Sequence, residues 1–202
     1  MQALSKEKWN TKAMVKISIL GVLAFVLMLF EMPLAWIAPP FIQLDISDVP
    51  ALLGSFALGP MAGVIIQFLK NILKLVFVGS GTGGVGELAN FLVGSTFAFT
   101  AGLIYLRKKT FKSAVIGLIT GTLVMAIVIT IANYFVMFPF YAKLFGWPLQ
   151  EFVNMGTAIN GNIVDLKTLM FYSIFPFNIL KGSLVTILTV LIYKRVSPIL
   201  HK

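Results

Sequence analysis

Most charged residues of this chain stand in the short stretches between long apolar segments, and the two signs of charge are segregated. Charged side chains are costly inside a bilayer, and cytoplasmic connections carry an excess of Lys and Arg. The pattern therefore predicts a polytopic membrane protein whose orientation can be inferred from its sequence. The basic clusters are Lys6, Lys8, Lys12 and Lys16, then Arg107, Lys108, Lys109 and Lys112, then Lys194, Arg195 and Lys202.

The composition agrees with a chain surrounded by lipid. Of the 202 residues, 58% are hydrophobic and 11% are charged, whereas soluble domains carry about 25% charged residues. We interpret the net charge of +9 as a topology signal and not as a nucleic-acid surface, because the basic clusters flank apolar runs. The chain has no cysteine, which excludes disulfides and thiol chemistry. Its length predicts one domain over residues 1–202.

Six hydrophobic segments can be drawn along the chain. A membrane-spanning helix needs about 20 apolar residues, so the second segment is too short to span alone. We expect it to be tilted, buried among its neighbours or partly inserted, with Asp48 as its N-cap and Gly59-Pro60 breaking the chain after it. The segments are predicted at residues 14–30, 49–58, 61–78, 87–106, 113–138 and 169–193.

An even number of crossings places both ends of the chain on one side of the membrane. With that side in the cytoplasm, all three basic clusters lie inside, as the positive-inside rule requires. The expected fold is an all-α six-helix transmembrane bundle with cytoplasmic N- and C-termini, in the plasma membrane of a bacterium. Five of the seven acidic residues then lie outside: Glu31, Asp45, Asp48, Glu151 and Asp165.

Polar side chains inside the third segment form a candidate site. Gln67, Lys70, Asn71 and Lys74 are separated by three or four residues, which places them on one helical face. Polar groups at membrane depth are costly and mark either function or packing. We take Lys70 and Asn71 as candidate ligand contacts, and the alternative is that the lysines snorkel to the outer interface.

The sixth segment carries the sharpest functional signal. Asn178 and Lys181 lie three residues apart, hence on one helical face, and Lys181 is too deep to snorkel comfortably. A lysine at that depth needs an acceptor, which is either a polar ligand or a carboxylate such as Glu87. Pro176 also frees a backbone carbonyl one turn earlier. We expect Asn178 and Lys181 to contact a ligand.

Further polar residues lie in the outer halves of the fourth and fifth segments. Glu87 and Asn90 are again three residues apart, although Glu87 is also the kind of carboxylate that a helix start favours. Asn133 and Tyr141 follow in the fifth segment and beyond it. The inner halves are nearly pure aliphatic. This gradient predicts a pocket open to the outside above a closed plug, because a through-pore needs a polar lining along its whole length.

Two sequence patterns resemble chemical motifs but lack the structural context that those motifs require. The run Gly79–Gly84 has the spacing of a dinucleotide fingerprint but joins two membrane segments, so we interpret it as a turn. Asp45 and Asp48 could bind a divalent ion, although a helix cap is the simpler role for Asp48. No nucleotide-binding P-loop and no catalytic or metal-binding cluster can be assembled. We therefore expect no enzymatic activity and no metal or other cofactor.

Small residues recur at four-residue spacing and predict close helix packing. Gly94, Ala98 and Gly102 form one such series, and Gly117 and Gly121 form another. The first segment also presents small residues among large aliphatic ones, which makes it a candidate docking helix for a membrane partner. The docking candidates are Ala13, Ser18, Gly21 and Ala24.

Three stretches together resemble a known family. These are Leu44–Pro50 (LDISDVP) before the short second helix, Gly86–Phe91 (GELANF), and Pro176–Gly182 (PFNILKG). They are similar to the substrate-binding S components of energy-coupling factor (ECF) vitamin transporters. The last stretch is most similar to the riboflavin-specific branch, the RibU family. The resemblance covers nearly the whole chain.

The resemblance implies a function and a set of partners. Such a component captures its vitamin from outside, docks on a transmembrane coupling protein (EcfT) driven by two cytoplasmic ATPases, and releases the vitamin inside. Asn178 and Lys181 would contact the ligand, as would Glu87 and Asn90, while the loop with Phe41 and Leu44 would act as a lid. The first helix departs from the family's alanine-x-x-x-alanine docking motif, because Ile17 follows Ala13 at that spacing.

The residues agree chemically with riboflavin as the transported ligand. Aromatic side chains suit its flat ring, and amides and a lysine suit the donors and acceptors of its pyrimidine edge. The alternatives are an S component for another vitamin, an intramembrane enzyme using Asp45 and Asp48 with a metal, and a stand-alone secondary transporter. The last often shows inverted repeats, and no convincing internal repeat is present.

Overall fold

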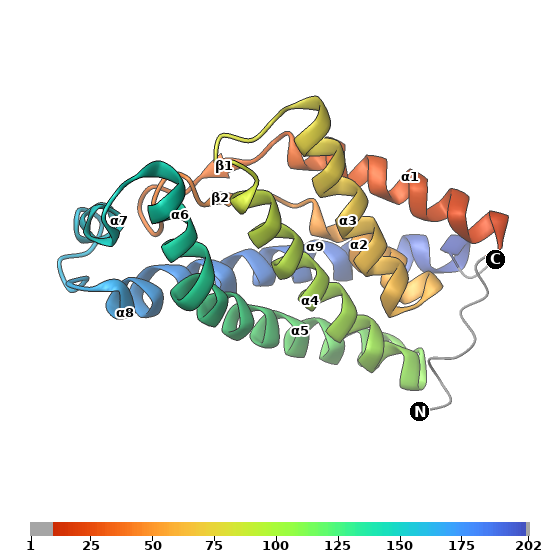
Figure 1. Cartoon of the computed structure of the whole chain (residues 1–202). Coiled ribbons are helices and arrows are strands. Elements are labelled where there is room, and N and C mark those ends of the chain that lie inside the picture. The colour runs from red at the N-terminus through yellow and green to blue at the C-terminus, as the bar shows by residue number, and fades with distance from the viewer. Residues whose placement is uncertain (1–9, 201–202) are drawn as a thin grey trace.

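The computed structural model describes residues 10–200, so Lys6, Lys8, His201 and Lys202 lie outside the described part. The chain forms a bundle of long helices with short helices gathered at one end (Figure 1). The elements in order are α1 (Thr11–Met28), β1 (Met32–Pro33), β2 (Gln43–Leu44), α2 (Asp48–Leu58), α3 (Pro60–Phe77), α4 (Val85–Lys108), α5 (Phe111–Ala132), the π-helical turn η2 (Asn133–Met137), α6 (Phe138–Phe145), α7 (Leu149–Thr157), α8 (Leu166–Leu169), the π-helical turn η3 (Met170–Ile174) and α9 (Phe175–Leu200).

Five helical stretches among the described residues are long and apolar enough to cross a membrane. This confirms a helical, multi-pass membrane protein, while the count of six crossings and the cytoplasmic ends stay predictions. The spanning stretches are Thr11–Met28, Pro60–Phe77, Val85–Lys108, Phe111–Phe145 and Leu166–Tyr193.

The short helix α2 lies in the middle of the bundle. It packs against α1, α3, α4 and α9, and every residue from Asp48 to Phe56 is buried. A helix enclosed on all sides by protein does not need the length of a lipid-facing span. Of the three alternatives expected for this segment, burial among its neighbours is the one that the structure shows.

Helix starts and loops differ from the sequence prediction in three places. The N-cap of α2 is Ser47, and Asp48 is the first helical residue, because its carboxylate binds side chains of α3 instead of capping its own helix. The segment between α1 and α2 contains an antiparallel strand pair in which Met32 pairs with Leu44. The stretch between the predicted fifth and sixth segments, residues 139–168, is largely helical, with α6 continuing the helix of α5 and α7 following it.

Each π-helical turn ends two residues before a proline. Pro139 and Pro176 are the second residues of α6 and α9. A proline has no N–H, so the carbonyl four residues earlier loses its α-helical hydrogen-bond donor. These carbonyls belong to Phe135 in η2 and to Tyr172 in η3. The wider π turns accommodate this loss within one continuous helix.

The glycines singled out by their spacing do mediate close helix contacts. A Cβ at Gly117 of α5 would lie 2.7 Å from the carbonyl oxygen of Ala101 in α4. At Gly121, a Cβ would lie 2.8 Å from the ring of Phe97. These distances are below normal van der Waals contact, so α4 and α5 pack at a separation that only glycine permits.

The two ends of the bundle have different characters. The start of α1, the end of α9 and the α4–α5 connection lie at one end, and the strand pair with α6, α7 and α8 lies at the other (Figure 1). The first end is closed by aromatic side chains, with Phe56 packed on Tyr105 and Tyr193 and the two tyrosine hydroxyls 2.7 Å apart. We call it the closed end, and the other the pocket end.

Candidate functional site

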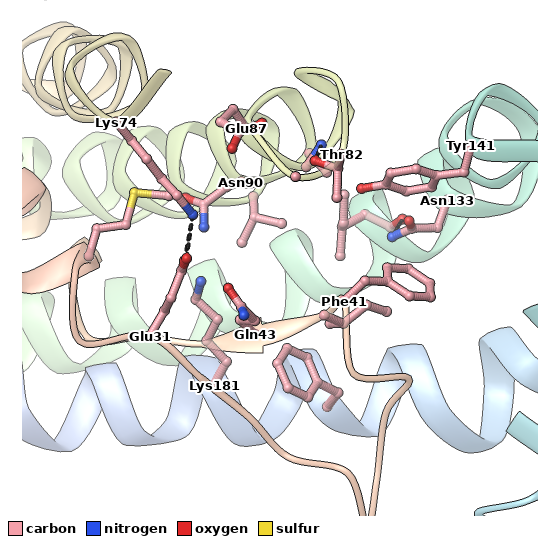
Figure 2. A pocket seen from close by; sticks show the side chains of 18 of the residues that line it. Glu31, Phe41, Gln43, Lys74, Thr82, Glu87, Asn90, Asn133, Tyr141 and Lys181 are labelled. Carbon is pink, nitrogen blue, oxygen red and sulfur yellow. Dashed lines mark hydrogen bonds and ion pairs between the residues drawn. The ribbon is translucent and has the colours of Figure 1, made fainter. Parts of the chain in front are cut away.

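A cavity of about 410 Å³ lies between the strand pair, α3, α4, η2, α6 and α9. This volume falls within the range of small-molecule sites, about 300–1,000 Å³. Its lining combines charged, amide and aromatic side chains from segments far apart in sequence (Figure 2). Seven of the residues predicted from the sequence line it: Phe41, Glu87, Asn90, Asn133, Tyr141, Asn178 and Lys181.

Lys181 reaches the pocket from α9 and is held by a buried carboxylate. Its Nζ lies 2.8 Å from Oδ2 of Asp45, and the amide of Asn90 donates to the same oxygen at 3.4 Å. Burial alone would raise the pKa of Asp45, but the ammonium groups of Lys181 and Lys70 and the hydrogen bonds from Lys181 and Ser47 hold it well below its ordinary value. Lys181 thus has the carboxylate partner that its depth requires, in Asp45 and not in Glu87.

A second buried pair lies beneath the first. Lys70 donates to Asp48 Oδ1 and to the Ser47 hydroxyl, each at 2.7 Å, and Gln67 donates to the same Asp48 oxygen at 2.8 Å. Lys181 also approaches Asp48, at 3.8 Å from Oδ2. Two aspartates and two lysines therefore form a charge-balanced cluster under the pocket, which is the condition for burying charges.

Three predicted contacts do not line the cavity. Lys70 is fully buried in the cluster with Asp48, and Asn71 is buried with its amide donating to the Gln67 carbonyl at 2.8 Å. Leu44 belongs to β2 and lies outside the lining as well. The polar face of α3 points into the bundle. Gln67 and Lys70 on this face bind Asp48, and Lys74 reaches the cavity.

Three polar residues that were not predicted as ligand contacts also line the cavity: Glu31, Gln43 and Lys74. Lys74 of α3 binds both carboxylate oxygens of Glu31, at 2.5 and 2.7 Å (Figure 2). In the orientation that satisfies both side chains, the Gln43 amide donates to Glu31 at 2.7 Å. Glu31 and Gln43 stand before and within the strand pair, and no helical periodicity exists there to reveal which side chains face a cavity.

The glycine-rich turn between α3 and α4 forms another wall. The Ser80 hydroxyl donates to Oε2 of Glu87 at 2.6 Å and accepts from the backbone N–H of Gly84 at 2.8 Å. Thr82 accepts from the backbone N–H of Gly86 at 3.0 Å. The turn is therefore held by side-chain caps, and it positions Glu87 and Thr82 in the lining.

Two asparagines face the cavity at the π-helical turns. Asn133 lies in η2 and donates to the Ile129 carbonyl at 2.9 Å, and Asn178 follows η3 and donates to the Ile174 carbonyl at 2.8 Å. Among the described residues, no hydrogen bond is made to the oxygen of either amide. Each amide thus uses its donor on its own helix and keeps an acceptor for a ligand.

Aromatic rings cover the side of the pocket next to α6 and α7. Phe41 lies with its ring centre 5.5 Å from Tyr141 and 5.9 Å from Phe138, and it meets Phe152 edge-on at 5.7 Å. Aromatic pairs at these separations stabilise one another. The segment between α1 and α2 therefore contacts the short helices through Phe41 and binds α3 through the ion pair of Glu31 with Lys74.

The charged groups of the cluster are paired with one another, and the lining suits a bound ligand. Among residues 10–200 there is no group of three or more acidic or histidine side chains that could hold a metal ion. Asp45 and Asp48, the carboxylates of the enzyme alternative, are each neutralised by a buried lysine. The pocket offers a flat apolar wall, acceptors from two amides and a fixed cation, which suits a planar ligand with polar edges.

The small residues of α1 divide between two faces. Gly21 and Ala24 are buried, and a Cβ at Gly21 would lie 3.1 Å from Leu69 of α3. Ser18 is exposed and donates to the Met14 carbonyl at 3.0 Å, and Ala13 is half-buried. Part of the predicted docking face is therefore used within the chain, and a docking role stays a prediction for Ala13 and Ser18.

The fold and the site define a small helical membrane protein with a ligand pocket near one end and a closed apolar bundle at the other. The family model for the ECF transporter, substrate-specific component, matches residues 12–193. The chain belongs to this family. The family consists of transporter components, which confirms the expectation that the chain is not an enzyme.

Individual relatives agree with the family. The chain is 40% identical over 193 residues to the riboflavin transporter RibU of Staphylococcus aureus (strain TCH60), covering 96% of this chain and 94% of the relative. It is 33% identical over 190 residues to the riboflavin transporter FmnP of Bacillus subtilis (strain 168), covering 94% of each. A solved structure of the S component of a bacterial ECF transporter superposes with a TM-score of 0.74 at 38% identity, covering 95% of this chain and 98% of that one.

Proposed function

We propose that this chain is the riboflavin-binding S component of an ECF transporter in the plasma membrane of a bacterium. It captures riboflavin from outside and delivers it inward with an ATP-driven module. The observation that carries the proposal is the composition of the pocket lining, which brings Asn133, Asn178 and Lys181 to one cavity beside the ring of Tyr141. The similarity to proteins named riboflavin transporters supports it.

The proposed binding mode matches the donors and acceptors of riboflavin. The pyrimidine edge of the flavin carries one N–H between two carbonyls. The free amide oxygens of Asn133 and Asn178 accept from an N–H, and Lys181 donates to a carbonyl. Phe41 and Tyr141 pack against the apolar ring, and Glu87, Asn90 and Thr82 bind the ribityl hydroxyls.

The partners are a transmembrane coupling protein of the EcfT kind and two cytoplasmic ATPases. Six crossings with cytoplasmic ends put the pocket end outside and the basic α4–α5 connection inside, as the positive-inside rule requires. Docking uses the accessible face of α1, including Ala13 and Ser18. Riboflavin is the transported ligand, and the chain uses no cofactor.

The first experiment is a spectrum and a titration. The chain is purified in detergent, and its visible absorption is recorded. Riboflavin is then titrated into ligand-free protein while flavin fluorescence is followed. We expect a yellow preparation and tight one-to-one quenching. A colourless protein with no quenching would contradict riboflavin as the ligand, and other vitamins would then be tested in the same assay.

Two pocket variants test the binding mode. We expect Lys181→Ala and Asn178→Ala each to weaken riboflavin binding by roughly tenfold or more, because a lost hydrogen-bond partner in a buried site costs about 1–3 kcal/mol. Gln150→Ala, at an exposed position of α7 outside the lining, serves as the matched control and should bind like wild type. Wild-type affinity in both pocket variants would remove these residues from the site.

A further inference from the structure

We propose that the basic connection between α4 and α5 binds the phosphate group of an anionic phospholipid. This connection lies at the closed end of the bundle (Figure 1) and carries four cations within six residues: Arg107, Lys108, Lys109 and Lys112. All four are exposed, and none takes part in an ion pair within residues 10–200. The connection is remote from the pocket, so the proposal does not depend on which ligand the pocket binds.

Lys109 stands where the backbone favours glycine. It is the C-cap of α4, with φ 45° and ψ 41°, and among the described residues it is the one non-glycine residue with a positive φ. Helices that end in this left-handed conformation usually have glycine there, because a Cβ is disfavoured. The Lys109 N–H donates to the Tyr105 carbonyl at 2.8 Å, so the helix end fixes the conformation. A lysine at a disfavoured backbone position suggests a role for its side chain.

Lys112 is disfavoured by the helix that contains it. It is the second residue of α5, and the N-terminal turn of a helix carries a partial positive charge that repels a cation. Arg107 and Lys108 differ, because they lie in the last turn of α4, where the helix dipole favours cations. Local structure therefore explains two of the four charges, and a bound anion would explain Lys109 and Lys112.

The connection holds its cations in an ordered turn. The hydroxyl and the carbonyl of Thr110 accept from the backbone N–H groups of Ser113 and Ala114, at 3.2 and 2.9 Å. The Ser113 hydroxyl donates to the Ile104 carbonyl of α4 at 3.0 Å and so ties the start of α5 to the preceding helix. A bound anion does not have to order this backbone, which lowers the cost of binding.

The surroundings favour a lipid as the source of the anion. Phe111, Ile116 and Ile119 of α5 are 41%, 47% and 54% exposed, on a stretch that is long and apolar enough to cross a membrane. The cations stand at the end of this apolar surface, where basic side chains meet the charged headgroups of a bilayer.

The described part of the chain supplies no carboxylate to this connection. Six of the seven acidic residues are described, and they lie at the pocket end or in the cluster beneath it. The connection therefore presents uncompensated positive charge beside lipid-facing side chains. An anionic phospholipid such as phosphatidylglycerol satisfies both features, through its phosphate and its acyl chains.

The test counts the lipids that stay bound to the purified chain. Phosphatidylglycerol and phosphatidylcholine with the same acyl chains are titrated separately into the protein in an uncharged detergent, and native mass spectrometry gives the two dissociation constants. Each lysine near a charged membrane surface contributes about fivefold in affinity, or about 1 kcal/mol. We expect wild type to prefer phosphatidylglycerol by at least about fivefold, and the double variant Lys109→Gly, Lys112→Gln to lose most of that preference.

Two further variants separate a lipid contact from a structural role. Lys143→Gln removes the same charge from an exposed position of α6 at the other end of the molecule, and it should keep the wild-type ratio. Lys109→Gly should weaken the lipid preference and yet melt at or above the wild-type temperature, because glycine suits the backbone there. A merely structural lysine would instead give a lower melting temperature and an unchanged ratio.

Three results would overturn the proposal. The first is equal affinity of wild type for the two lipids, and the second is a wild-type ratio in the double variant, even where riboflavin uptake is lost, since that loss would assign the cations to an acidic protein partner. The third is displacement of the lipid by equimolar glycerol 3-phosphate, which would indicate a site for a soluble phosphate ester. Riboflavin titration of the same samples tests the proposed function separately, and all the variants should bind riboflavin like wild type.

Discussion

Asp45 connects two residues of the candidate site without lining the pocket itself. Its Oδ2 accepts from Lys181 of α9 and from Asn90 of α4, at 2.8 and 3.4 Å. We expect Asp45→Asn to weaken riboflavin binding by about tenfold, or about 1.4 kcal/mol, because the ammonium loses the acceptor that fixes its position. Equilibrium titration by flavin quenching measures the loss.

Asp48 provides the matched control for Asp45. It is an equally buried carboxylate in the same cluster, but its short contacts are to Lys70 and Gln67, which do not line the pocket. Removing one partner of a buried ion pair costs about 3–5 kcal/mol of stability, so both variants should lower the melting temperature. The affinity for riboflavin should fall mainly in Asp45→Asn. In a Lys181→Met background, Asp45→Asn should reduce the affinity less, because the effects of two residues that act together are not additive. Equal affinity losses for Asp45→Asn and Asp48→Asn would contradict this positioning role.

Individual site residues could be predicted where a polar side chain lies inside an apolar helix, because such a group is costly in a membrane. Lys181 and Asn178 stand out because a polar group inside an apolar helix needs a reason, and both line the pocket. The partner of Lys181 was not predictable, because Glu87 and Asp45 satisfy the same requirement and only the fold brings Asp45 to 2.8 Å. Lys70 is also a lysine inside an apolar helix, but it binds Asp48 in a buried ion pair and does not line the pocket. Depth in the membrane therefore indicates that a lysine has a partner, not whether the partner is a ligand.

The segment between α1 and α2 is the element that encloses the pocket. Phe41 fastens it to the short helices, through Phe138, Tyr141 and Phe152. We expect Phe41→Ala to raise the dissociation rate of riboflavin by at least about fivefold, because truncating an aromatic anchor removes about 0.5–1.5 kcal/mol of ring contacts beyond its buried area. Stopped-flow recovery of flavin fluorescence measures the rate. Phe171→Ala removes an exposed ring of η3 and should leave the dissociation rate unchanged. An unaltered rate in Phe41→Ala would show that the segment between α1 and α2 does not limit the release of riboflavin.

Elements were predictable in proportion to their length and periodicity. The long apolar runs gave helices at the expected places, and Gly59-Pro60 does end α2 and begin α3. The two-residue strands and the four-residue helix α8 were missed, because so few residues carry no periodic signal. Helices α6 and α7 were missed as well, although α7 buries Phe152, Val153 and Gly156 on one face. The π-helical turns have a local cause in Pro139 and Pro176, but which residues a wider turn directs into a cavity depends on the packing of α5 against α9.

At the scale of the whole molecule, the buried charged groups are concentrated toward the pocket end, and the interior of the closed end is largely apolar. The cluster of Asp45, Asp48, Lys70 and Lys181 marks the boundary, since it underlies the pocket. Beneath it, apolar side chains and the tyrosine pair of α4 and α9 fill the bundle. Because this packing fills the bundle beneath the pocket, we expect the proposed delivery of a ligand to the other side to need a movement of the protein, which a docked partner can provide.

Orientation of the whole molecule is the last prediction, and the chain is suited to test it because it contains no cysteine. Gly161→Cys lies at the pocket end, where an added Cβ meets no atom within 4 Å, and Lys108→Cys lies at an exposed position beside the α4–α5 connection. If the basic connection is cytoplasmic, a membrane-impermeant maleimide should label Gly161→Cys in intact cells and Lys108→Cys only after permeabilisation. The unmodified chain should take no label in either condition. The reverse pattern would invert the protein and place the pocket on the cytoplasmic side, where it could not capture a vitamin from outside. Labelling of both positions in intact cells would contradict a membrane crossing by α5.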